Sequence, residues 1–194
     1  MHLFSKTIIA VALFISISST SAQEPATLAA KIKRFTPTTI TGNVSKLSVG
    51  DRKTLSKLIE AAKLMDSIYL GQVWSGNIDL WNQLQKDNTP EGKEKAHFFR
   101  INMGPWSKLD HDEPFIDGAP KTKPSGANYY PEDMSKEEFN GWMNALPESV
   151  QQKATGFFYT IRRNQDDRLY AKPYSEEYRP ILERAANLLE EAQH

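Results

Sequence analysis

The sequence predicts a mainly α-helical protein with one small β-hairpin. Apolar residues recur at the three- and four-residue spacing of helices along most of the chain after Ser48. Two short segments, Phe157–Arg163 and Arg168–Tyr174, flank the polar turn Asn164–Asp167 and are predicted to form the hairpin, whereas Thr36–Leu47 is expected to be loop or a short strand. The formal net charge is zero, so the composition indicates neither nucleic acid nor an anionic membrane as a partner. The chain has no Cys, which excludes disulfides and thiolate metal sites.

The N-terminus has the organisation of a secretory signal peptide. Residues Met1–Ala22 contain a short polar start, an apolar run over Thr7–Ile17 and small residues before the expected cleavage site. The apolar run is shorter than the roughly 20 residues of a membrane span. We therefore expect export to a periplasm or the medium, with no membrane attachment after cleavage; an uncleaved N-terminal anchor is the alternative. Residues 23–47 are polar and are expected to form an arm or linker before a helical domain over residues 48–194.

Three helices are expected between Ser48 and Arg100. Ser48, with Asp51 three residues later, predicts a capping box at the start of the longest helix, Ser48–Trp74. Its apolar stripe consists of Leu55, Leu58, Ile59, Ala62, Met65, Ile68 and Tyr69. Shorter helices are expected over Ile78–Lys86 and from Pro90 to Arg100, because proline fits the first turn of a helix.

The segment Asn102–Pro131 is predicted to be irregular, because its prolines and glycines are too dense for a helix. Loops of this length in compact proteins are usually functional or disordered. The aromatic residues scattered through the segment disfavour disorder, since such side chains need burial or a ligand.

A second helical region is expected after this loop. Ser135 with Glu138 predicts another capping box, and a short helix restarts after Pro147. The hairpin follows, and a last helix is predicted from Ser175 to His194. Its apolar stripe continues to the end of the sequence, so we expect the chain to end before its fold does; a C-terminal helix docked on the domain is the alternative.

Three sequence blocks together resemble one protein family. They are FRINMGPW at Phe99–Trp106, GANYYPEDM at Gly126–Met134 and FYTIRRNQDDRLYAKPYSEEY at Phe158–Tyr178. In this order they are similar to the N-terminal region of the bacterial dipeptidyl peptidase III-like zinc metallopeptidases. The resemblance implies part of a two-lobed, mostly helical fold around a wide cleft. It also implies an enzyme that uses one zinc ion to remove dipeptides from the N-termini of peptides.

The zinc motif of that family is absent from this sequence. The resemblance places the zinc ligands on a His-Glu-x-x-Gly-His or similar helix and a downstream Glu. The histidines here are His2, His97, His111 and His194, and none is followed by Glu. Because a zinc hydrolase needs three protein ligands and an open position, we expect neither zinc nor catalytic residues in this chain. It would then be a truncated member of the family that is inactive alone. Two alternatives remain: a secreted binding or regulatory module, and a subunit completed in trans by a zinc-bearing chain.

Asn128, Tyr129 and Tyr130 are the candidate substrate-binding residues. They lie between the turn residues Gly126 and Pro131. Adjacent residues of extended chain point to opposite sides, so one tyrosine can pack inward while the other faces a cleft. In the full-length family the partner would be a peptide substrate; the missing C-terminal part, bound in trans, is a second possible partner.

The remaining acidic, histidine, serine, arginine and tryptophan residues of interest are expected to have structural rather than catalytic roles. Leu109–Glu113 is expected to be a solvated acidic turn, with a loose cation site as the alternative. His97 is expected at the surface or in the core rather than in catalysis, and Ser125 has no plausible His partner. The pair Arg162-Arg163 is expected to bind Asp166-Asp167 across the hairpin turn. The tryptophans expected in the core are Trp81, Trp106 and Trp142.

Overall fold

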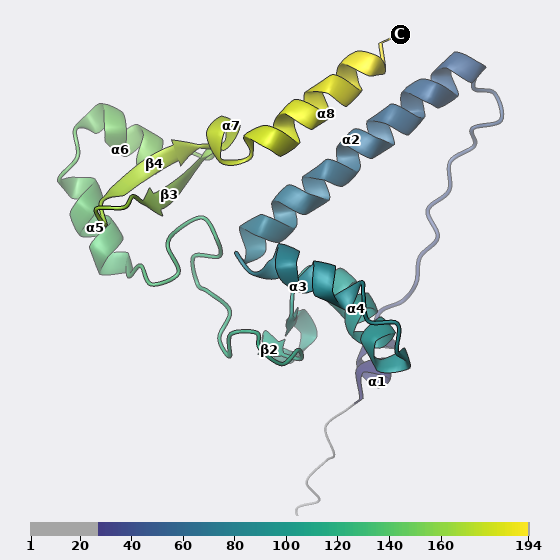
Figure 1. The fold of residues 1–194 in the computed structure, drawn as a ribbon, viewed down its shortest axis with the longest axis horizontal. Helices are drawn as coiled ribbons and strands as arrows, with labels where there is room; N and C mark the ends of the chain where they lie inside the picture. Colours follow the sequence, from purple (N-terminus) through teal and green to yellow (C-terminus); the bar gives the residue numbers. More distant parts are fainter. Residues whose placement is uncertain (1–26, 194) are drawn as a thin grey trace, which may run out of the picture.

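The computed structural model describes residues 27–193. The predicted signal peptide, Met1–Ala22, and His194 lie outside the described residues. Helices dominate, and two small antiparallel strand pairs complete the described structure (Figure 1), which confirms the predicted fold class. The helices are α1 Leu28–Ile32, α2 Val49–Val73, α3 Asn77–Leu84, α4 Pro90–Asn102, α5 Lys136–Asn144, α6 Glu148–Ala154, α7 Tyr174–Glu177 and α8 Arg179–Glu191. The strands are β1 Trp106–Ser107, β2 Glu113–Pro114, β3 Tyr159–Arg163 and β4 Leu169–Pro173. Within residues 27–193, no helix is long and apolar enough to cross a membrane.

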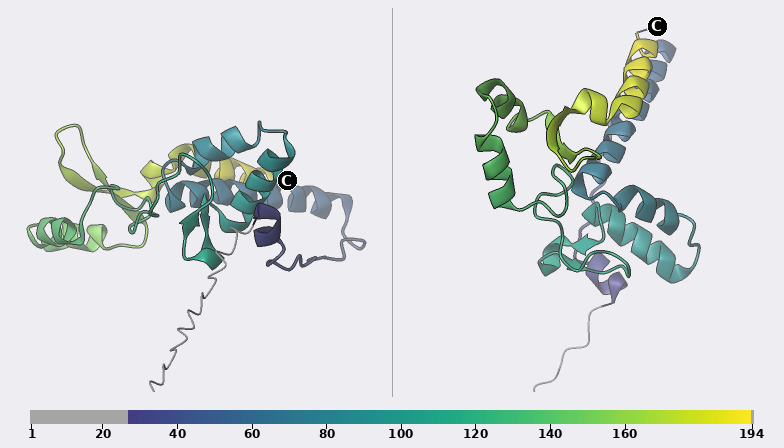
Figure 2. Two further views of the ribbon diagram at one scale, coloured as in Figure 1. Left: turned by 90° about the horizontal axis from the view of Figure 1, so that it is seen from below. Right: turned by 60° about the vertical axis from the view of Figure 1, so that its left-hand side comes forward.

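Helices α2 and α8 form an antiparallel pair. The C-terminal end of α8 lies beside the first turns of α2, where Lys57 Nζ is 2.6 Å from a Glu191 carboxylate oxygen. The Thr54 hydroxyl donates to the Ala192 carbonyl at 3.0 Å. Figures 1 and 2 show the two helices side by side and projecting beyond the rest of the chain. The pair therefore has broad flanks that no other described element covers along much of their length.

The helix ends follow local side-chain chemistry, with one correction. The predicted capping box of Ser48 with Asp51 forms at the start of α2. The prediction of a single helix from Ser175 to His194 was wrong, because α7 ends before Tyr178 and α8 begins after it. The cause is Pro180, which has no N–H to donate and whose ring collides with the carbonyl of the fourth preceding residue in a continuous helix.

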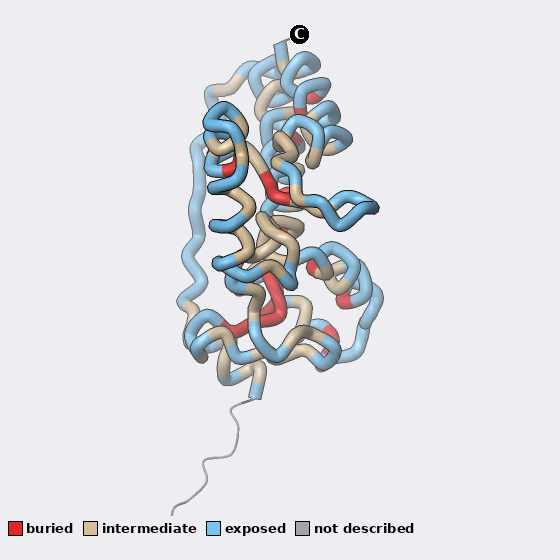
Figure 3. The backbone as a smooth tube through the Cα atoms, turned by 90° about the vertical axis from the view of Figure 1, so that its left-hand side faces the viewer, coloured by how far each residue is buried: buried red, intermediate tan, exposed pale blue. Residues whose placement is uncertain are grey.

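The main apolar core lies at the base of α2, where α3 and α4 pack against it. Its buried centre consists of Leu70, Leu84 and Phe99. The Trp81 ring stacks on Phe99 with the ring centroids 5.6 Å apart. The neighbouring Phe98 is also fully buried, and its ring lies 4.5 Å from that of Phe115. Figure 3 shows that buried backbone is concentrated near this base and at β3, whereas α2 and α8 are mostly exposed.

The segment predicted to be wholly irregular contains a small hairpin. Strands β1 and β2 pair with Trp106 opposite Pro114, and a 3₁₀ turn over Lys108–Asp110 joins them. Trp106 is buried, and its indole N–H donates to the Pro120 carbonyl at 3.0 Å. Strands of two residues are too short for an alternating pattern to be read from the sequence, which explains the miss.

The acidic cluster at Asp110 holds α1 in place. The Arg34 guanidinium binds both Asp110 oxygens, at 2.7 and 2.6 Å, and Lys31 Nζ lies 3.2 Å from the same carboxylate. Hydrogen bonds from Arg34 and the Ser107 hydroxyl hold the pKa of this carboxyl well below its usual range. The expectation of a solvated acidic turn was therefore wrong for Asp110, because its partners come from a segment far away in the sequence.

Candidate functional site

The loop Pro124–Pro131 is fixed to the C-terminal end of α2. The last carbonyls of a helix have no partner inside the helix. Asn128 serves two of them: its Nδ2 donates to the Gly71 carbonyl and its backbone N–H to the Gln72 carbonyl, both at 2.8 Å. The Tyr129 hydroxyl donates to Gln72 Oε1 at 3.2 Å. The amide group of Asn128 therefore acts as a C-terminal cap, and Tyr129 points towards α2.

The same loop also runs beside β3. The Ile161 N–H donates to the Tyr129 carbonyl at 2.8 Å, so Tyr129 accepts this hydrogen bond as a residue of a neighbouring strand would. Arg162 Nη2 donates to the Asn128 carbonyl at 2.9 Å. Asn128 and Tyr129 thus join α2 to the hairpin, and both use their backbone and side-chain polar groups in doing so.

Arg162 is the charged centre of this junction. Its Nη2 and Nε lie 2.6 and 2.9 Å from one Glu177 oxygen, and Lys172 Nζ lies 2.9 Å from the other. The Arg162 and Glu177 side chains are only 18% and 15% exposed. Burial by itself would raise the pKa of Glu177, but hydrogen bonds from Lys172 and Arg162 outweigh it, and the pKa is lowered.

The predicted ion pairs across the hairpin turn are confirmed only in part. Arg163 Nε is 3.6 Å from Asp167, but the closest partner of Arg163 is Glu138 of α5, at 2.8 Å. Arg162 binds Glu177 instead of the turn, so that half of the prediction was wrong. Spacing in the sequence favours the nearest carboxylates as partners of the two arginines. In the structure their closest partners, Glu177 and Glu138, belong to other elements.

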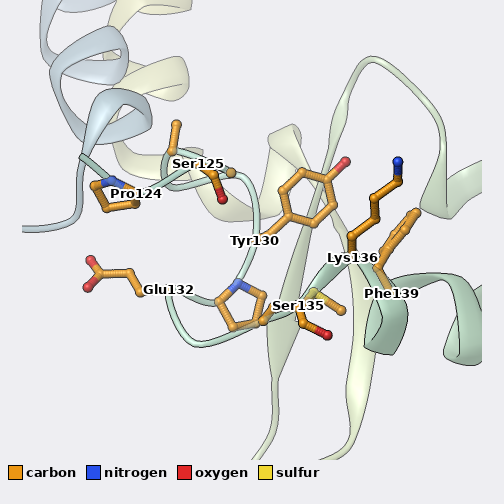
Figure 4. Close-up of a pocket in the computed structure, with 11 residues that line it drawn as sticks. Pro124, Ser125, Tyr130, Glu132, Ser135, Lys136 and Phe139 are labelled. Carbon is orange, nitrogen blue, oxygen red and sulfur yellow. The ribbon is translucent and has the colours of Figure 1, made fainter. Parts of the chain in front are cut away.

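Tyr130 lines a pocket of about 230 Å³ (Figure 4), and Tyr129 is not among the residues that line it. The Tyr130 ring meets the Phe139 ring edge to face, with the centroids 5.3 Å apart. Gly126 permits this arrangement, because a Cβ there would lie 3.0 Å from Tyr130 Cδ2. The other apolar lining residues are Pro124, Ala127, Pro131 and Met134.

Two polar side chains that line the pocket, Glu132 and Ser135, have hydrogen-bond partners. The Ser75 hydroxyl donates to Glu132 at 2.6 Å, and Ser135 Oγ accepts the Glu138 N–H at 3.0 Å. Lys136, the first residue of α5, is exposed and extends along the same side of the pocket as the Tyr130 ring (Figure 4). The pocket is therefore an apolar slot with a cation at its rim, which suits an apolar side chain of a peptide.

Residues that could perform acid–base, nucleophilic or metal chemistry do not converge. His97 is exposed on α4, and His111 is exposed in the β1–β2 turn. Ser125 is exposed at the pocket, and among residues 27–193 no group of three or more His, Cys, Asp or Glu side chains could hold a metal ion. The zinc ion that the family resemblance implies therefore does not fit the residues described. The tryptophans contribute to packing: Trp106 is buried, and Trp81 and Trp142 are half-buried against aromatic neighbours.

The structure brings the candidate residues together, but one residue that lines the pocket, Phe139, could not be found from the sequence. Asn128, Tyr129 and Tyr130 lie at one junction, and only Tyr130 lines the pocket. Phe139 packs against Tyr130 and lines the same pocket. Its place on the apolar stripe of a helix signalled core packing, and nothing in the sequence distinguished a core position from a pocket wall. A role for Asn128, Tyr129 or Tyr130 in binding substrate stays a prediction.

Comparison with known proteins gives a sequence relative and two similar solved structures. No protein-family model matches the chain. Nudix hydrolase 3 of Arabidopsis thaliana is 34% identical over 210 residues, covering 84% of this chain and 27% of that protein. Dipeptidyl-peptidase III of Corallococcus sp. strain EGB has a TM-score of 0.80 and 45% identity over 85% of this chain. The enzyme of Caldithrix abyssi has a TM-score of 0.76 and 43% identity over 84%. This chain spans 30% of the length of each of these two solved chains. The protein is thus a dipeptidyl-peptidase III-like polypeptide with the fold of a part of that enzyme.

Proposed function

We propose that this chain forms the non-catalytic part of an exported dipeptidyl peptidase III-like zinc hydrolase and is inactive alone. The observation that carries the proposal is the 45% identity to the Corallococcus enzyme at a TM-score of 0.80. Identity at that level over 85% of the chain supports more than a shared fold. The zinc and its ligands would come from polypeptide outside residues 27–193, because no described cluster suits a metal ion.

In this proposal the Tyr130 pocket borders the substrate cleft of the complete enzyme. An apolar slot beside the Lys136 ammonium would receive an apolar peptide side chain, while the loop itself stays fixed to α2 and β3. Export rests on the signal-peptide pattern of Met1–Ala22. The activity in the name of the Arabidopsis relative is not proposed, because that protein is 34% identical to this chain and the Corallococcus enzyme is 45% identical.

The pocket also favours a second candidate function, a secreted binding module without catalysis. Such a module would bind an apolar ligand group in the same pocket, which both Tyr130 and Phe139 line. The two candidates differ in whether the chain needs further polypeptide to complete its surface.

The activity of the chain alone tests the inactive-alone claim. The purified chain is incubated with zinc and a hexapeptide, and dipeptide release is followed by mass spectrometry, with the Corallococcus enzyme as the positive control. We expect no release above the buffer rate, and fewer than about 0.1 zinc ions bound per chain, because three convergent protein ligands are lacking. Zinc-dependent dipeptide release by the chain alone would contradict the proposal.

A further inference from the structure

Helices α2 and α8 project together beyond the rest of the described chain (Figures 1 and 2). Their outer flanks are therefore open to contact with another polypeptide, and the composition of each flank indicates whether such a contact is expected.

One flank of the pair carries an apolar stripe along α2. The stripe that faces α8 includes the buried residues Ala61 and Ile68. A second stripe lies one residue further along the helix and consists of Leu58, Ala62, Met65 and Tyr69. All four residues are exposed, with Leu58 at 43%, Met65 at 41% and Tyr69 at 44%. Spacings of three and four residues place the four on one side of the helix.

Helix α8 repeats this arrangement. Its buried residues, Ala185 and Leu188, face α2. The stripe one residue further along consists of Leu182, which is half-buried, and of Ala186 and Leu189, which are exposed, Leu189 at 48%. In each helix the second stripe is displaced by one residue, in the chain direction, from the stripe that faces the partner helix. Because the two helices are antiparallel, this displacement puts both second stripes on the same side of the pair. We call the seven residues of these two stripes the apolar flank.

The other side of the pair has the opposite character. On α2 it carries Lys53, Ser56, Glu60 and Lys63, and on α8 it carries Arg184, Asn187 and Glu191. Only one side of the pair therefore has the composition of a buried interface. Surface helices that expose a continuous apolar stripe usually pack it against another element.

We propose that the apolar flank is an interface. It packs against the part of the dipeptidyl-peptidase III fold that this chain does not match. This inference rests on the proposed function. This chain matches 30% of the Corallococcus enzyme. If it keeps the fold of that part, it also keeps the surface through which that part contacts the rest of the enzyme. Two layers of amphipathic helices bury such stripes by ridges-into-grooves packing. A second copy of this chain is the competing occupant.

The test compares the same substitutions in two settings. The first is this full chain; the second is the Corallococcus enzyme with its matched segment replaced by residues 27–193. The flank variant is Leu58→Glu with Leu189→Glu, and the matched control is Ser56→Glu with Asn187→Glu. All four positions are exposed helix positions of the isolated chain, so both variants should melt within about 1 °C of the parent chain.

In the chimera we expect the flank variant to melt about 5–10 °C lower, because two glutamates would enter an apolar interface, while the control melts within about 2 °C. Equal melting of the two variants in a folded chimera overturns the inference, whether or not that chimera cleaves peptides. A second result would also overturn the inference. The isolated chain would form dimers that dissociate only in the flank variant, and the two variants would melt equally in the chimera. The flank would then be assigned to a second copy. A chimera without activity that still distinguishes the variants counts against the proposed function and not against the interface.

Discussion

Phe99→Ala should lower the free energy of unfolding of the chain by about 3–5 kcal/mol, the usual cost of a fully buried phenylalanine. Phe99 is 0% exposed, stacks on Trp81 and touches Leu70 and Leu84, which come from two other helices. Its removal leaves a cavity that three rigid helices cannot collapse to fill. Since folded domains are stable by only about 5–15 kcal/mol, we expect a large shift of the urea midpoint followed by circular dichroism.

The matched control for this experiment is His97→Ala. His97 belongs to the same helix and is exposed, so its replacement should change the free energy of unfolding by less than about 0.5 kcal/mol. Equal urea midpoints for the two variants would show that α4 does not pack on α2 and α3 as described.

Arg162→Met should lower the free energy of unfolding by about 2–4 kcal/mol, somewhat less than for a fully buried ion pair. The substitution leaves Glu177 largely buried with only Lys172 as a partner, and it removes the donor to the Asn128 carbonyl. Arg168→Met is the control, because Arg168 is an exposed arginine in the same hairpin.

Two further measurements separate lost charge pairing from lost packing. Adding Glu177→Gln to Arg162→Met should recover part of the loss, because it removes the largely buried carboxylate that Arg162 no longer neutralises, whereas the Lys172 ammonium left behind is more exposed, at 30%. The lowered pKa of Glu177 means that its contribution is present above the ordinary value of 4.5 and is lost as the pH falls through the folded value. The double variant should lack this part of the acid sensitivity. An Arg162→Met chain as stable as Arg168→Met would contradict the network.

Local chemistry explains which parts of the fold the sequence predicts. The α2 start at Ser48, the Pro90 start of α4 and the β3–β4 hairpin depend on residues within a few positions of one another. The contacts that organise the junction do not. Arg162 reaches Glu177 and Asn128, and Asp110 reaches Arg34, across 15 to 76 positions. Several carboxylates could have been their partners, and only the tertiary fold selects among them.

The candidate site divides in the same way. The sequence shows that the Tyr129-Tyr130 stretch lies in a loop and that adjacent residues point apart. The structure adds that Asn128 caps α2, which accounts for its side chain without a ligand, and that Tyr130 faces a pocket. The pocket wall at Phe139 could not be predicted, because an inward-facing residue of an amphipathic helix has the same spacing whether it faces a core or a cavity.

The most direct measurement is the rate at which the chimera of the Corallococcus enzyme, with residues 27–193 in place of its matched segment, releases dipeptides from a peptide N-terminus. If this chain is the non-catalytic part of a dipeptidyl peptidase III-like hydrolase, the chimera should work within about tenfold of the parent enzyme, equivalent to about 1.4 kcal/mol in the activation barrier. A chimera that folds and holds one zinc ion like the parent, yet releases no dipeptide, would contradict the account.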